Sequence, residues 1–157
     1  MAAQGCHILV IASAGKVVNI LQISLTTFLV LQLLLICYSD IRHRIISNKR
    51  VTTVAINTLF LSLIIYDAVS FIIPLLALLT GYIVFYFKLI GGGDVKLITV
   101  LLFALNPEQS LNFILYTAIM GGVVMIIGLL FNRVDIQQRG VPYAVAISTG
   151  FLISFFS

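Results

Sequence analysis

Charged residues are scarce in this sequence. Only 9% of its 157 residues are Asp, Glu, Lys or Arg, whereas a soluble domain carries about 25% charged residues. The shortage excludes an ordinary soluble domain. Apolar residues make up 61% of the chain and its mean hydropathy is +1.19, which predicts a polytopic membrane protein. No segment is polar enough to form a separate domain, so we expect one membrane-embedded domain over residues 1–157.

Cysteine and histidine are also rare, with two of each. Cys6 and Cys37 form no CxxC pair, so neither a structural zinc site nor a disulfide framework is supported. His7 and His43 have no ligand-like spacing to a partner. We therefore expect no metal ion or other cofactor.

The chain lacks a basic face interleaved with aromatic residues that could stack on bases. The net charge of +4 does not require a nucleic-acid partner, because Lys and Arg gather at the cytoplasmic edges of membrane proteins. We expect a lipid bilayer as the surroundings and no nucleic-acid partner.

The N-terminus has only part of a secretion signal. Ala12-Ser13-Ala14 has the small residues of a cleavage site, but a basic region is missing and the apolar run His7–Ile11 is too short. We interpret residues 1–17 as an uncleaved lead-in.

Apolar runs divide the rest of the chain into six candidate spans: 18–39, 51–66, 69–87, 91–106, 110–131 and 141–156. A helix needs about 20 residues to cross a bilayer. The first, third and fifth spans meet this length, the second and sixth are marginal, and the fourth is short. We expect Pro74 to kink the third span, and Ala118 with Gly122 to allow close helix packing. The predicted fold is all-α, a six-helix transmembrane bundle.

Charges in the connections predict the orientation. Alternate connections share a side of the membrane, which places eight of the nine basic residues on one side and Lys16 on the other. The positive-inside rule assigns the basic side to the cytoplasm. Both termini then lie outside. Asp40 and Asp94, 54 positions apart, fall at the same cytoplasmic boundary, whereas Asp67 and Glu108 fall on the opposite side.

Two carboxylates at one depth can share a proton, because like charges a few ångströms apart do not both ionise readily. Such a pair can supply a base that activates water and an acid that protonates a carbonyl oxygen or leaving amine. A helix beginning near Asp94 would also direct its positive end toward that carboxylate.

Other interpretations of the same residues stay open. Glycine before a helix-starting Asp94 is ordinary N-cap chemistry, and Asp40 beside Arg42 and Arg44 fits an interfacial ion pair. As a pair, the aspartates also fit a proton relay in a small transporter. Transporters commonly have two interrupted helices, one in each half of the chain. Here glycines interrupt the start of one span only, at Gly91–Gly93. A third possibility is a catalytically silent assembly factor.

Three segments resemble a known family. Asp40 to Asn48 (DIRHRIISN) is similar to the D-x5-I-P-N segment of bacterial type IV prepilin peptidases, and Gly91 to Leu97 (GGGDVKL) is similar to their GxGD-x-K-L segment. Val141 to Gly150 resembles the P-Y-x-x-A-I run that opens the family's last helix. The resemblance covers residues 20–157. The small size resembles the short form associated with tight-adherence (Flp) pili, without the cysteine-containing insertion of longer members.

The resemblance implies an aspartic endopeptidase of the bacterial inner membrane. It would remove a short basic leader from a prepilin on the cytoplasmic side, after a glycine and before the pilin's hydrophobic helix. Asp40 and Asp94 match the catalytic pair. The motif-supporting matches are Gly91, Gly93, Lys96, Arg44 and Asn48.

One residue departs from the family pattern: Ser47 stands where proline is usual, which puts the geometry of the first loop in doubt. The sequence leaves open the particular prepilin, N-methylation, the oligomeric state and which aspartate acts as base.

Overall fold

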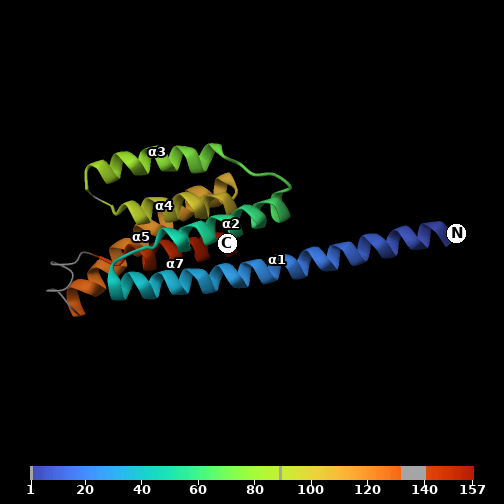
Figure 1. Ribbon diagram of the computed structural model, residues 1–157, viewed down its shortest axis with the longest axis horizontal. Helices are drawn as coiled ribbons and strands as arrows, with labels where there is room; N and C mark the ends of the chain where they lie inside the picture. Colours follow the sequence, from blue (N-terminus) through green and yellow to red (C-terminus); the bar gives the residue numbers. More distant parts are fainter. Residues whose placement is uncertain (1, 89, 132–140) are drawn as a thin grey trace.

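The computed structural model describes the backbone of residues 2–88, 90–131 and 141–157, and the side chains of residues 15–88, 90–130 and 141–157. In these ranges the fold is all-α, as predicted (Figure 1). Its elements are α1 (Ala2–His43), α2 (Asn48–Tyr66), α3 (Ile72–Tyr86), α4 (Gly92–Leu101), a 3-10 turn η1 (Leu102–Ala104), α5 (Pro107–Phe131) and α7 (Tyr143–Phe156).

Three of the described helices are long and apolar enough to cross a bilayer: Gly15–His43 within α1, Asn48–Tyr66, and Pro107–Leu130 within α5. Apolar helices α3 and α7 are shorter, with 15 and 14 residues. Two of the predicted lengths were therefore wrong. The third span, which was expected to be long enough to cross a bilayer, forms a shorter helix, whereas the second, which was expected to be marginal, forms a helix that is long enough.

Pro74 explains the short third span. It lies in the first turn of α3, where a missing N–H costs no intrahelical bond. The expected kink is therefore wrong: Pro74 marks the start of the helix instead. Upstream, Asp67 adopts a left-handed conformation (φ 52°) that ends α2.

The helices run up and down, so alternate connections lie at the same end (Figure 1). The α1–α2 and α3–α4 connections share one end with the last turns of α5 and the start of α7, while the α2–α3 and α4–α5 connections lie at the other (Figure 1). This alternation agrees with the predicted order of connections. The predicted fifth connection, with Arg133, Asp135 and Arg139, lies outside the described residues.

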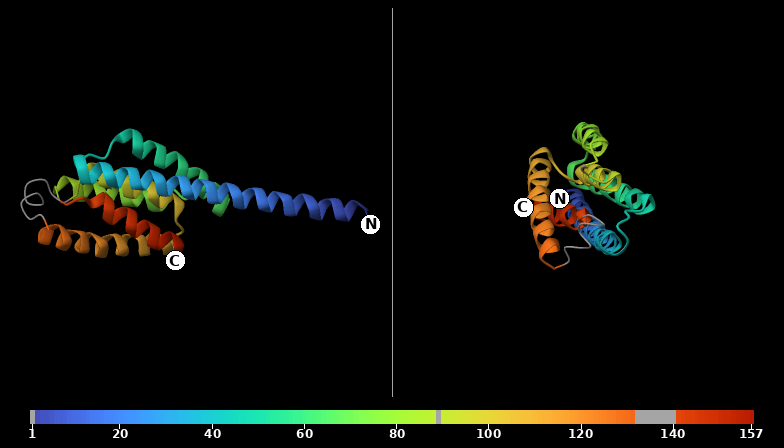
Figure 2. Two further views of the ribbon diagram at one scale, coloured as in Figure 1. Left: turned by 90° about the horizontal axis from the view of Figure 1, so that it is seen from below. Right: turned by 90° about the vertical axis from the view of Figure 1, so that its left-hand side faces the viewer.

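α4 lies inside the bundle, where it packs against α2, α3 and α7. Its side chains Leu97 and Leu101 are fully buried, and they join Leu33 of α1, Leu61 of α2 and Phe151 of α7 in one apolar core. Figure 2 shows the bundle from its end, with α3 and α5 on its outside. α4 can be shorter than a helix that crosses a bilayer, because the neighbouring helices surround it.

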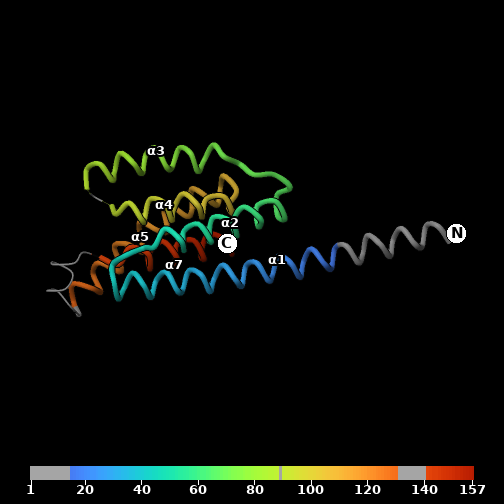
Figure 3. Tube along the Cα trace, viewed as in Figure 1, coloured from blue at the N-terminus to red at the C-terminus, as the bar shows by residue number. Residues whose placement is uncertain are grey.

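α1 begins at Ala2. The part of this helix drawn in colour in Figure 3 already extends past the bundle at its N-terminal end. The predicted lead-in, residues 1–17, therefore continues the first helix over the described residues. The part of α1 near its C-terminal end packs against α2 and α7.

Close packing of α5 and α7 depends on Gly150. A Cβ at Gly150 would lie 2.7 Å from the backbone nitrogen of Thr117, so only glycine fits. A Cβ at Gly122, by contrast, would meet nothing within 4 Å. We expected Gly122 to bring two helices together. That expectation is wrong, because the space next to this residue of α5 is open.

Candidate active site

Asp40 lies in the last turns of α1, and its side chain is only 6% exposed. The backbone N–H of Ala144, in the first turn of α7, donates a hydrogen bond of 2.9 Å to its Oδ2. The N-terminus of a helix carries free N–H groups and a partial positive charge. The start of α7 therefore fixes the orientation of Asp40.

The chain turns directly after Asp40. Arg44 adopts a left-handed conformation (φ 54°), and its N–H donates to the carbonyl oxygen of Asp40 at 2.9 Å, which ends α1. Ser47 is the N-cap of α2, with φ −68° and ψ 133°. That φ is the one proline would impose. The backbone at Ser47 thus has the proline-like geometry that the sequence left in doubt.

Asp94 lies in the first turn of α4, after the N-cap Gly91. Its carboxylate folds back over Gly91, where a Cβ would lie 2.8 Å from Oδ2. A Cβ at Gly93 would lie 3.0 Å from the Cβ of Ile46, in the loop that follows α1. The first glycine leaves room for the carboxylate, and the third lets α4 approach that loop.

The two aspartates line one pocket, although they come from α1 and α4. This pocket has a volume of about 670 Å³, and Arg44, Lys88 and Tyr143 also contribute to its wall. The structure therefore brings together the carboxylates that the charge pattern placed at one boundary.

Lys96 and Asn48 lie outside this pocket. The Lys96 ammonium donates a hydrogen bond of 3.1 Å to Oδ1 of Asn48, which joins α4 to the first residue of α2. Two of the predicted motif-supporting residues thus tie together the segments that carry the aspartates. Arg42 is engaged elsewhere, because it donates to the hydroxyl of Tyr38 at 2.7 Å and lies over that ring.

Sequence reasoning missed the contribution of α7. Tyr143 lines the pocket and the N–H of Ala144 binds Asp40. The sequence indicated these two residues only as members of the motif Val141 to Gly150, without a role in the site. A proline at position 142 was the available signal for a helix start. Cys37, one turn before Asp40, also contacts α7, with Sγ 3.2 Å from the hydroxyl of Ser148. Within the described ranges, no three His, Cys, Asp or Glu side chains cluster as metal ligands.

A family model described as the type IV leader peptidase family matches residues 27–126, more than half of the chain. The matched region contains both Asp40 and Asp94. Comparisons with curated proteins and with solved structures each found no match. The family match indicates a peptidase that acts on prepilins, in keeping with the resemblance of the two motifs that lie inside the matched residues, Asp40 to Asn48 and Gly91 to Leu97. The chain belongs to the type IV leader peptidase family.

Proposed function

We propose that this protein is an aspartic endopeptidase of the bacterial inner membrane. It removes the short leader of type IV prepilins, of the kind found in Flp pili, at the cytoplasmic boundary. The observation that carries the proposal is the shared pocket of Asp40 and Asp94, two ionisable residues from distant parts of the chain. Ionisable side chains at membrane depth are costly and mark functional sites.

The pair acts on a water molecule and on the scissile amide. One carboxylate takes a proton from water while the hydroxide so formed attacks the carbonyl carbon, and the other carboxyl group protonates the carbonyl oxygen. The first carboxyl group then gives the proton that it took from water to the amine nitrogen as the C–N bond breaks, and the second carboxylate takes back the proton of the carbonyl oxygen as the C=O bond re-forms. Interacting carboxyl groups titrate as a unit, so we assign the base and acid roles to the pair and not to either residue.

Charge supports the cytoplasmic placement. The α1–α2 connection carries Arg44, the first turn of α2 carries Lys49, and the α3–α4 connection carries Lys88, at the end of the bundle where the two aspartates lie. At the opposite end, Asp67 follows α2 and Glu108 lies in the first turn of α5. Basic residues at one end of a multi-pass bundle face the cytoplasm.

The proton-relay hypothesis has less support. A transporter is expected to have two broken helices in corresponding halves. The glycines Gly91–Gly93 lie at the start of α4, whereas α1, which carries the other aspartate, is an unbroken helix up to His43. The family match favours a peptidase as well.

The proposal is tested by co-expression with candidate prepilins, one of Flp type and one of longer type IV form, followed by gel analysis of leader removal. We expect Asp40→Ala and Asp94→Ala to abolish cleavage while the protein stays inserted. Asp67→Asn is the matched control, since Asn tolerates the left-handed backbone there. Normal processing by either alanine variant would overturn the proposal, and the mass of the product's N-terminus reports methylation.

A further inference from the structure

The first turn of α7, which carries the donor to Asp40, is weakly held by its own hydrogen bonds. Its N-cap is Pro142, which makes no side-chain hydrogen bond to the helix, and the N–H of Val145 makes only a 3.4 Å bond to the carbonyl oxygen of Pro142. Helix ends fray, because their first N–H groups have no intrahelical partner. Yet the N–H of Ala144 in this turn has to stay on the Asp40 carboxylate. A contact from outside α7 must hold the turn in place.

α1 holds both ends of Ala144. The N–H of Ala144 donates to Oδ2 of Asp40, and the thiol of Cys37 donates to its carbonyl oxygen, with Sγ at 3.5 Å. Cys37 and Asp40 are three residues apart in α1, so they lie on one face of that helix. Because α1 and α7 run in opposite directions (Figure 1), the N–H of Ala144 points toward Asp40 and its C=O toward Cys37.

Ser148, one turn further along α7, adds a second contact. Its hydroxyl oxygen lies 3.2 Å from Sγ of Cys37. The Ser148 side chain is only 4% exposed, and a buried hydroxyl needs a hydrogen-bond partner. Cys37 therefore connects two successive turns of α7 to α1, and it fixes how far α7 lies along that helix.

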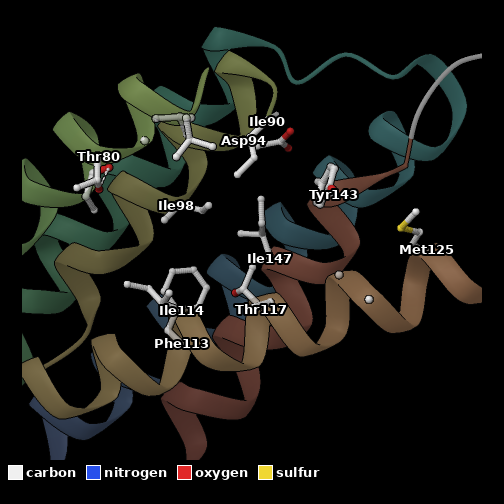
Figure 4. Close-up of a pocket in the computed structure, with 17 residues that line it drawn as sticks. Thr80, Ile90, Asp94, Ile98, Phe113, Ile114, Thr117, Met125, Tyr143 and Ile147 are labelled. Atoms are coloured by element: carbon white, nitrogen blue, oxygen red, sulfur yellow. Dashed lines mark hydrogen bonds between the residues drawn. The ribbon is translucent and has the colours of Figure 1, made fainter. Parts of the chain in front are cut away.

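Another face of α7 borders a cavity. Tyr143 and Ile147 line an apolar cavity of about 450 Å³ that lies between α7 and α5, beside Asp94 (Figure 4). Side chains at a cavity lose contacts on that side and fix a helix less closely than packed ones. The close approach of α7 to α5 occurs at Gly150, about two turns further along. The alignment of the first turn of α7 thus depends on its contacts with α1.

We propose that Cys37 is a positioning residue for the catalytic carboxylates. By holding the carbonyl oxygen of Ala144 and the hydroxyl of Ser148, its thiol keeps the N–H of Ala144 directed at Asp40. Cys37 does not line the carboxylate pocket, so it acts through Ala144. This inference rests on the proposed function and adds to it the residue that sets the orientation of Asp40.

A purely apolar role is the alternative, because a free cysteine often behaves as a small hydrophobe. Packing alone, however, requires no acceptor near the sulfur atom. Sγ of Cys37 has two, and one of them belongs to the residue that binds Asp40.

The first test removes and then restores the donor. Cys37→Ala removes the thiol, whereas Cys37→Ser keeps a donor at the same position. We expect Cys37→Ala to lower kcat for prepilin cleavage by about 3- to 10-fold, the loss typical of one neutral hydrogen bond, and to leave KM unchanged. Cys37→Ser should keep at least about half of the wild-type kcat.

Ser154→Ala is the matched control for the packing of α7. Ser154 is also buried, and its hydroxyl donates to the carbonyl oxygen of Gln109, near the other end of α7. We expect its kcat to equal that of the wild type, measured on purified protein whose thermal unfolding is followed in parallel. A loss as large as that of Cys37→Ala would overturn the inference, because any loosening of α7 would then slow cleavage.

The second test asks whether Cys37 acts through the N–H of Ala144. An ester in place of that amide, introduced with the α-hydroxy analogue of alanine, removes the N–H and leaves the carbonyl oxygen that Cys37 contacts. We expect Cys37→Ala to slow the ester protein by less than about twofold, since the group that Cys37 positions is already absent. Losses that multiply, or a Cys37→Ser protein as slow as Cys37→Ala, would overturn the inference.

Failure of this inference is distinct from failure of the proposed function. If Asp40→Ala and Asp94→Ala still cleave prepilin, the proposed function falls. If both abolish cleavage and Cys37→Ala keeps full kcat, the proposed function stands and Cys37 has a packing role alone.

Discussion

The N–H of Ala144 holds the carboxylate of Asp40 at 2.9 Å, across 104 positions of sequence. The family match ends at residue 126, before α7 begins, yet α7 supplies this donor. Asp40 is buried, and a buried carboxylate needs hydrogen-bond partners. The C-terminal helix is therefore part of the candidate active site as well as of the core.

Replacing the amide of Ala144 by an ester removes only this donor. We expect about 10- to 100-fold loss of peptidase activity, because a hydrogen bond to a charged group contributes about 1.5–3 kcal/mol. The measurement is the cleavage rate of the purified protein with the α-hydroxy analogue of alanine at position 144. An ester at Val145, whose N–H makes only a 3.4 Å bond to the carbonyl of Pro142, is the control. Equal losses for both esters would show that helix α7, and not the bond to Asp40, is affected.

Gly91 and Gly92 differ in what a methyl group would meet. At Gly91 it would lie 2.8 Å from Oδ2 of Asp94, whereas at Gly92 it would lie 3.3 Å from the ring of Phe85. Gly91→Ala must displace the carboxylate, and a misplacement of about 1 Å can cost about 100-fold in rate. We expect Gly92→Ala to lose much less activity, because the Phe85 ring can shift. Cleavage kinetics of the two variants, at equal amounts of inserted protein, decide the matter, and similar rates would contradict this account of Gly91.

Gly150 and Gly122 make a matched pair for stability. Gly150→Ala forces a methyl group against the backbone of Thr117, and overpacking of this kind costs about 1–3 kcal/mol. Gly122→Ala meets no neighbour and gains helix propensity of up to about 1 kcal/mol. Thermal unfolding in detergent should therefore rank Gly122→Ala at or above wild type and Gly150→Ala below it. A destabilised Gly122→Ala would show that α5 packs there against something else.

The sequence predicted the class of fold and the meeting of the two aspartates for a physical reason. Long apolar runs have to form helices in a bilayer, alternate connections share a side, and charge assigns the basic side to the cytoplasm. Asp40 and Asp94 could be paired without knowledge of any contact. Helix lengths were harder to predict from the sequence, because a proline inside an apolar run, such as Pro74, is compatible with either a kink or a helix start.

Two features of the candidate site have no sequence signal of their own. The donor to Asp40 is a backbone N–H, which every residue but proline has, so Ala144 carries no mark of its role. Ser47 looked like a departure, yet a residue other than proline can adopt the same φ. Tertiary packing decides the first, since the start of α7 and the end of α1 must be brought side by side before Ala144 can reach Asp40.

The most direct test of the central claim is the cleavage rate of Asp40→Asn, Asp94→Asn and the double variant, measured with purified protein and prepilin. Residues that act as one catalytic unit show non-additive losses. We predict that each single variant loses at least about 10⁴-fold and that the double variant is slower by no more than about tenfold again. A single variant that keeps more than about a tenth of the wild-type rate, or losses that multiply in the double variant, would contradict joint catalysis by Asp40 and Asp94.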